Sequence, residues 1–246
     1  MHCEIAQTPE SLATNCNIVI TMLADDAASK NVYFGESGLL KGKKAMVFIE
    51  MSTVSPNWIK RLQSQSSRAI VVDAPVSGAT QAAQAGKLMI MVGGSDSIVQ
   101  PLLPIFEVLG EKIIILGQQS AGATMKLAIN SVIHSLNQAT AESLNLAQAA
   151  GIDLPLAYEA LESSAACAPM LRYRKPIYLD EHAHQVMFTV GLAAKDVDLA
   201  TRLAHTLNVQ MPQAELNLGI LNQANQNGYA QRDMASVISY LKKEHK

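Results

Sequence analysis

The first half of the chain alternates short runs of apolar residues with segments of helical pattern. The runs are continuous and rich in valine, isoleucine and methionine, which is typical of strands covered on both faces of a parallel sheet. Helical segments between several of these runs indicate β–α–β units. The predicted strands are 17–22, 46–51, 70–73, 88–92 and 112–116, and the predicted helices between them are 25–33, 56–65 and 97–109.

One long helix is predicted to follow, between Gly117 and Gly151, two glycines that can start and stop it. If residues 120–150 are helical throughout, the helix is roughly 45 Å long at about 1.5 Å per residue, enough to belong to two domains. Apolar residues recur along it at the spacing of one helix face, which we expect to be buried. That face consists of Met125, Ala128, Ile129, Val132, Leu136, Ala139, Leu146, Ala147 and Ala150.

The opposite side of this helix carries a stripe that is polar but nearly uncharged. Lys126 is its only cation, and Asn130 follows four residues later, on the same helix face. A lysine beside an amide can exchange a proton with a substrate hydroxyl while the amide orients it, provided that burial or a nearby cation lowers the lysine pKa. The alternative is an ordinary solvated face. The stripe consists of Lys126, Asn130, His134, Asn137 and Gln148.

Beyond Gly151 the chain is almost entirely helix-forming, with predicted helices at 191–207, 212–226 and 232–243. Lys195 lies in the first turns of 191–207, and its spacing alone favours a solvated surface lysine. These helices carry more apolar residues than one buried face requires. We therefore expect a subunit interface and a homo-oligomer, either a dimer or a tetramer.

Composition excludes several classes of protein. The 246 residues have a formal net charge of −2, and no basic tract is long enough to indicate a nucleic-acid partner. The apolar runs are too short and too interrupted for a membrane span, and the first residues lack the layout of a signal peptide. The odd number of cysteines, without metal-ligand spacing, favours a reducing, cytoplasmic compartment and predicts no metal site. The cysteines are Cys3, Cys16 and Cys167.

Three loops at the ends of predicted strands are candidates for ligand binding: 21–25, 51–56 and 73–78. In open α/β sheets, ligands bind outside the carboxyl ends of the strands. Ser77 and Gly78 could present a hydroxyl and backbone N–H groups to a carboxylate. The alternative for each loop is turn formation and helix capping, as at Ser55 and Pro56.

Six motifs occur together in one order: ITMLAD, EMSTVSP, DAPVSG, KLMIMVGG, GATMKLAIN and AAKDVDLA. In this order they resemble the β-hydroxyacid dehydrogenase family, and the resemblance runs from about Thr8 to the C-terminus. It implies an α/β part followed by an all-α part. Residues 1–118 would form a truncated Rossmann-type parallel sheet that binds NAD(P). Residues 119–246 would form an all-helical substrate and dimerisation domain that includes the long interdomain helix.

The resemblance also implies roles for individual residues. Lys126 matches the catalytic lysine, which acts as general acid and base for the substrate hydroxyl, and Asn130 matches an asparagine that holds the substrate. Ser77 and Gly78 match the motif that binds the substrate carboxylate. The residues that match positions near the NAD or NADP cofactor are Met22, Leu23, Thr53 and Lys195, with Asp196 as structural partner of Lys195.

Two departures from the family pattern are evident. Ala79 stands where the family usually has a second glycine after Ser-Gly, which would narrow the carboxylate pocket. The first strand, the GxGxxG-like turn, the helix and the second strand of the family are absent, and with them the pyrophosphate cradle and the segment that distinguishes NAD from NADP. We therefore expect a longer protein in which Met1 is an internal methionine, with a genuinely short protein as the alternative.

Two functions are consistent with these features. The first is an NAD(P)-dependent oxidoreductase that interconverts a small 3-hydroxy acid and its semialdehyde. Its preferred substrate would be that of a 3-hydroxyisobutyrate dehydrogenase, with tartronate or succinic semialdehyde or glyoxylate reduction as the alternative. The second is an inactive, truncated oligomerisation module, which would bind no nucleotide.

Overall fold

The computed structural model describes residues 3–243, and it contains two compact units. The first unit ends at Leu127 and the second begins at Ala128, so that the division falls within the long helix α7 (Ala121–Ala149). The predicted long helix is therefore confirmed. The domain boundary at residues 118 and 119 stays a prediction.

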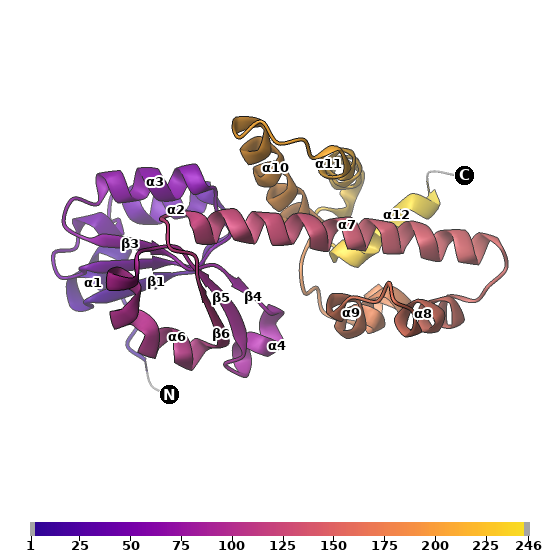
Figure 1. The fold of residues 1–246 in the computed structure, drawn as a ribbon, viewed down its shortest axis with the longest axis horizontal. Helices are drawn as coiled ribbons and strands as arrows, with labels where there is room; N and C mark the ends of the chain where they lie inside the picture. Colours follow the sequence, from indigo (N-terminus) through magenta and orange to yellow (C-terminus); the bar gives the residue numbers. More distant parts are fainter. Residues whose placement is uncertain (1–2, 244–246) are drawn as a thin grey trace. The chain divides into compact units, whose positions relative to one another are not determined.

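The first unit contains two small sheets (Figure 1). In one sheet, three parallel strands lie in the order β1-β2-β3, so that β1 is an outer strand. In the other, β5 pairs in parallel with β6 and antiparallel with the short β4, which was not predicted. The strands are β1 (Ile18–Thr21), β2 (Val47–Glu50), β3 (Ile70–Asp73), β4 (Val76–Ser77), β5 (Leu88–Val92) and β6 (Gly110–Ile115).

Helices cover both faces of the first sheet. Phe48 of β2 packs in a cluster that includes side chains of α2 and α3, whereas its neighbour Ile49 packs in a second cluster with side chains of β5 and α6. This arrangement explains why the strand sequences are continuously apolar. The predicted helix 97–109 is interrupted at Gln100–Leu102 because Pro101 and Pro104 cannot donate backbone hydrogen bonds. The helices are α1 (Pro9–Asn15), α2 (Asp26–Phe34), α3 (Pro56–Gln65), α4 (Ala79–Gln84), α5 (Asp96–Val99) and α6 (Leu103–Leu109).

The second unit is built from helices around the remainder of α7. In Figure 1, α8 and α9 lie on one side of α7, and α10 and α11 lie on the other. The predicted helix 232–243 begins later, because the Asp233 carboxylate accepts a hydrogen bond from Ala235 N at 3.0 Å and starts a 3₁₀ turn there. No helix within residues 3–243 has the length and apolar character needed to cross a bilayer. The helices are α8 (Leu154–Ser163), α9 (Pro169–Leu179), α10 (Val190–Thr206), α11 (Pro212–Ala224) and α12 (Val237–Lys243).

The prediction of which face of α7 is buried was wrong. Val132 and Leu146 of the apolar stripe are 59% and 73% exposed, whereas Asn130, His134 and Asn137 of the polar stripe are buried. Asn137 shows how the second unit tolerates buried polar groups. Its Nδ2 donates to the carbonyl of Met234 at 2.9 Å, and its Oδ1 accepts from the hydroxyl of Tyr178 at 2.5 Å. Partners distant in the sequence therefore satisfy its carboxamide.

The carboxylate of Asp73, at the end of β3, holds the N-terminus of α7. Its Oδ1 accepts from Ser120 N at 2.8 Å, and its Oδ2 accepts from Ala123 N at 2.9 Å. Burial raises the pKa of this carboxyl, although the backbone N–H groups counteract the rise. Gly122 permits this close packing, because an added Cβ would lie 2.3 Å from the carbonyl oxygen of Met91.

We expect Asp73→Ala to destabilise the first unit by about 2 to 4 kcal/mol, because two buried N–H groups lose their acceptor. Denaturant titration followed by tryptophan fluorescence measures this loss, since the only tryptophan, Trp58, is buried in the first unit. Asp153→Ala is the control, because Asp153 precedes α8 without making a side-chain capping bond. Equal effects of the two substitutions would contradict the capping role of Asp73.

Candidate functional site

The loops that follow β1 and β2 are tied together at the carboxyl ends of the strands. Leu23 N donates to Ser52 Oγ at 2.6 Å, so that the loop after β1 is fixed to the loop that contains Thr53. Met22 is exposed, and Leu23 and Thr53 are half-buried. Three of the four residues predicted to lie near the cofactor are therefore in neighbouring loops of the first unit.

Glu50, at the end of β2, accepts a hydrogen bond that holds the loop after this strand. No role was predicted for it from the sequence. The carboxyl is fully buried and accepts from Ser52 N at 3.0 Å and from Ser29 Oγ at 2.7 Å. Ser29 Oγ in turn accepts from the indole of Trp58 at 2.8 Å. Burial raises the pKa of Glu50, and the hydrogen bonds from the two serines only partly oppose this rise. In the sequence, the only indication of such a buried role is that Glu50 is a single acidic residue within an otherwise apolar run.

A cavity of about 320 Å³ lies beside β1 in the first unit. Its lining includes Met22 and Leu23, but Thr53, Ser77 and Gly78 do not contribute to it. Apolar side chains from β1 and α1, among them Ile20 and Leu12, form part of its wall. The cavity can therefore accept a largely apolar group next to the loop after β1.

Ser77 and Gly78 lie in the segment that leads from β4 into α4. Ser77 is half-buried and pairs with Met89 of β5. Gly78 has a φ of 140°, and an added Cβ would lie 2.7 Å from the Cβ of Ala82, so this position requires glycine. Ala79 follows with a φ of 54°, a left-handed conformation that costs about 1 to 2 kcal/mol outside glycine. Alanine thus adopts here a conformation that suits the glycine of the family pattern.

In the second unit, Asp196 of α10 connects two of the predicted site residues. Asn130 Nδ2 donates to Asp196 Oδ2 at 2.5 Å, and Lys195 Nζ lies 2.9 Å from Asp196 Oδ1. Burial by itself raises the pKa of Asp196, but its contact with His134 and the charge of Lys195 outweigh burial and lower it. Asp196 is therefore an ionised, fully buried acceptor that fixes the Asn130 carboxamide.

Lys126 lies on α7 one turn before Asn130 and is half-buried. The helix therefore places the amine and the carboxamide on neighbouring positions of one face. Such a pair can hold a hydroxyl group and exchange its proton.

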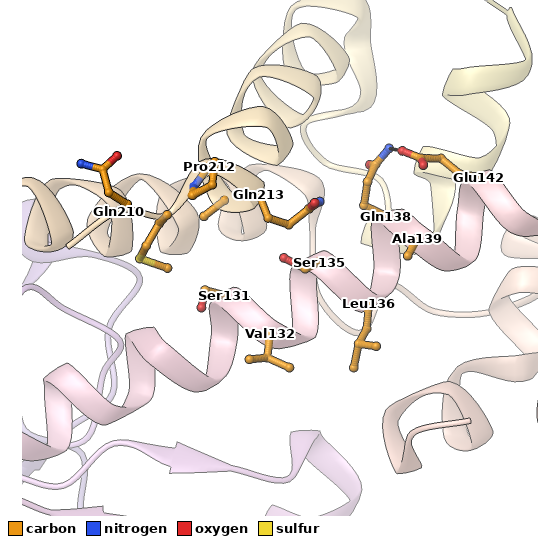
Figure 2. A pocket seen from close by; sticks show the side chains of 12 residues that line it. Ser131, Val132, Ser135, Leu136, Gln138, Ala139, Glu142, Gln210, Pro212 and Gln213 are labelled. Atoms are coloured by element: carbon orange, nitrogen blue, oxygen red, sulfur yellow. Dashed lines mark hydrogen bonds between the residues drawn. The ribbon is translucent and has the colours of Figure 1, made fainter. Parts of the chain in front are cut away.

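A larger cavity, of about 610 Å³, lies in the second unit between the middle of α7 and the start of α11 (Figure 2). Apolar side chains such as Val132, Leu136 and Met211 line it together with serine and glutamine side chains. A hydrogen bond of 2.7 Å joins Gln138 to Glu142. None of the residues predicted to bind substrate or cofactor lines it. Its polar groups include no cation, so it does not match the predicted chemistry. Among residues 3–243, no cluster of three His, Cys, Asp or Glu side chains is arranged to hold a metal ion.

Comparison with known protein families identifies both parts of the chain. Residues 1–117 match the NAD binding domain of 6-phosphogluconate dehydrogenase. Residues 120–241 match the family described as NAD-binding of NADP-dependent 3-hydroxyisobutyrate dehydrogenase.

Individual relatives agree with these matches. The 2-hydroxy-3-oxopropionate reductase of Escherichia coli is 30% identical, over 96% of this chain and 81% of the relative. The mitochondrial 3-hydroxyisobutyrate dehydrogenase of Mus musculus is also 30% identical, over 98% of this chain and 75% of the relative.

A solved structure supports the fold. The 3-hydroxyisobutyrate dehydrogenase of Salmonella typhimurium superposes with a TM-score of 0.86 at 22% identity, over 95% of this chain and 82% of that one. The Rossmann-like first part and the helical second part are thus confirmed. The chain belongs to the β-hydroxyacid dehydrogenase family, a family of NAD(P)-dependent dehydrogenases and reductases that act on small hydroxy acids.

Proposed function

We propose that this protein oxidises a small 3-hydroxy acid to its semialdehyde, and catalyses the reverse reduction, with 3-hydroxyisobutyrate as the preferred substrate. The observation that carries the proposal is the Lys126–Asn130 pair on α7, with the Asn130 carboxamide held by the buried Asp196 carboxylate. Tartronate semialdehyde, succinic semialdehyde and glyoxylate are the alternative substrates. They correspond to relatives such as the glyoxylate/succinic semialdehyde reductase 1 of Arabidopsis thaliana, which is 29% identical over 97% of this chain.

The acid–base step is assigned to Lys126. During oxidation its amine takes the proton of the substrate hydroxyl, and during reduction its ammonium returns a proton to the carbonyl oxygen. Asn130 donates one N–H of its carboxamide to Asp196 Oδ2, so that its second N–H is the donor assigned to the substrate oxygen while Lys126 exchanges the proton. Fixing both groups on one rigid helix reduces the orientational entropy that the reaction must otherwise overcome.

The carboxylate of the substrate is assigned to Ser77 and Gly78. Ser77 offers a hydroxyl donor, and the exposed backbone at Gly78 offers an N–H group that no side chain shields. A structure of the 3-hydroxyisobutyrate dehydrogenase of Mycobacterium tuberculosis with L-serine supports this substrate class, since L-serine is itself a small 3-hydroxy acid. That protein is 25% identical and has a TM-score of 0.80.

The cofactor residues are assigned to the loops after β1 and β2 and to α10. Met22, Leu23 and Thr53 would hold the nicotinamide end, and Lys195 would lie near it. The cavity lined in part by Met22 and Leu23 supports this assignment, whereas the sequence contains no GxGxxG turn to hold the pyrophosphate. When bound, NAD or NADP supplies the hydride acceptor or donor at the carbinol carbon. A reducing, cytoplasmic compartment is part of the proposal, because Cys3, Cys16 and Cys167 form no disulfide.

We also propose that the protein is a homo-oligomer that covers the exposed apolar stripe of α7. Val132, Leu136 and Ala139 of this stripe line the 610 Å³ cavity in Figure 2, and Leu146 lines a second cavity of about 450 Å³. Apolar side chains this exposed along one helix are typical of a subunit contact. A dimer in which the stripe packs on a second copy would bury them.

We expect Lys126→Ala to lower kcat by about 10²- to 10⁴-fold in a spectrophotometric NAD(P)H assay, because the hydroxyl proton loses its acceptor. Lys60→Ala, at an exposed position of α3, is the control and should retain activity. Near-normal turnover by the Lys126 variant would refute the assignment. A folded chain that binds neither NADH nor NADPH in a fluorescence titration would support the non-enzymatic oligomerisation module instead.

We expect Val132→Glu to convert the oligomer to a monomer, because burying an unpaired carboxylate in a subunit contact costs several kcal/mol. Size-exclusion chromatography with light scattering measures the change. Ala160→Glu places the same charge at an exposed position of α8 and should leave the mass unchanged. A monomeric unaltered protein would contradict the proposed contact.

A further inference from the structure

His134 is a buried histidine whose ring nitrogens make no hydrogen bond with the described residues. It lies on α7 one turn after Asn130 and is only 3% exposed. The ring of Phe188 stacks against it, with centroids 5.6 Å apart and an angle of 28° between the planes. Leaving a buried N–H without a partner costs about 1 to 3 kcal/mol, so a nearby acceptor is expected.

The carboxylate of Asp196 lies close to the ring of His134. His134 Nε2 is 3.8 Å from Asp196 Oδ2, the same oxygen that accepts the amide of Asn130. An ionised carboxylate oxygen can accept more than one hydrogen bond. A shift of about 1 Å would bring the imidazole to the length of a charge-assisted hydrogen bond.

We propose that His134 is a positioning residue for the reaction: it is the third partner of Asp196, after Asn130 and Lys195, and keeps the Asp196 carboxylate from rotating. Because Asp196 Oδ2 accepts one N–H of Asn130, a fixed carboxylate keeps the second N–H of Asn130 turned towards the substrate oxygen. In this role His134 acts through Asp196 and not on the reacting atoms. The effect on turnover rests on the proposed function, whereas the coupling of His134 to Asn130 through Asp196 does not.

The alternative is that His134 has only a packing role against Phe188. His134→Phe tests it, because phenylalanine keeps a planar ring in the stack and removes both nitrogens. His134→Gln is the conservative variant, since its carboxamide restores an N–H donor. His205→Phe is the matched control, because His205 lies exposed on the same helix as Asp196.

The first measurement is side-chain NMR of the ¹⁵N-labelled protein, which requires no activity. We expect the side-chain amide signals of Asn130 to shift in His134→Phe, to return towards their original positions in His134→Gln and to be unaffected by His205→Phe. Unchanged Asn130 signals in a folded His134→Phe variant would overturn the proposal. If that variant does not fold, the Asp196→Asn variant provides the test. We expect the ring-nitrogen signals of His134 to shift when Asp196 loses its charge. Unchanged signals would show that the two groups are not coupled.

The second measurement is steady-state kinetics. We expect kcat to fall about tenfold in His134→Phe with KM within about twofold, because orientation in the transition state is lost while binding is kept. His134→Gln should recover most of the loss, which a space-filling role does not predict. An unchanged kcat in His134→Phe would overturn the positioning role. Absence of turnover in the unaltered protein would instead count against the proposed function, and the NMR result would still decide the coupling.

Discussion

The capping of α7 by Asp73 is the interaction on which the arrangement of the first unit depends. Its carboxylate ends β3 and accepts the backbone N–H groups of Ser120 and Ala123, so that one side chain joins the edge of the sheet to the first turn of the helix. Gly122 lets the two backbones approach. Because a helix is rigid over a few turns, fixing its first turn also fixes the direction of Lys126, which follows within two turns.

Buried carboxylates organise both units, but in different chemical states. Burial raises the pKa of Glu50 and of Asp73, since each is surrounded mainly by neutral donors. Asp196 has a lowered pKa because Lys195 and His134 lie beside it. Neutral donors suffice where a carboxyl only has to hold backbone and hydroxyl groups, whereas a carboxylate beside a lysine adds a fixed negative charge.

Much of the fold follows from local patterns in the sequence, and the errors have a common physical cause. The strands of the first sheet were predictable because residues such as Phe48 and Ile49 pack on opposite faces and are both apolar. The buried face of α7 was not, because the groups that satisfy Asn130 and Asn137 lie at Asp196, Met234 and Tyr178, far along the chain. The motifs indicated the candidate site. Glu50 had only the signal of an acidic residue in an apolar strand, and His134 had only that of one member of a polar helix face.

The outer position of β1 in the described sheet has a consequence for how that sheet can be extended. Within the described sheet its partner lies on one side only, and its side chains Ile18 and Ile20 are 36% and 42% exposed. A short apolar strand with unpaired backbone groups is a template on which another strand can add. A strand added here, from the same polypeptide or from another, would extend the sheet through backbone hydrogen bonds and would need no contact with the helices.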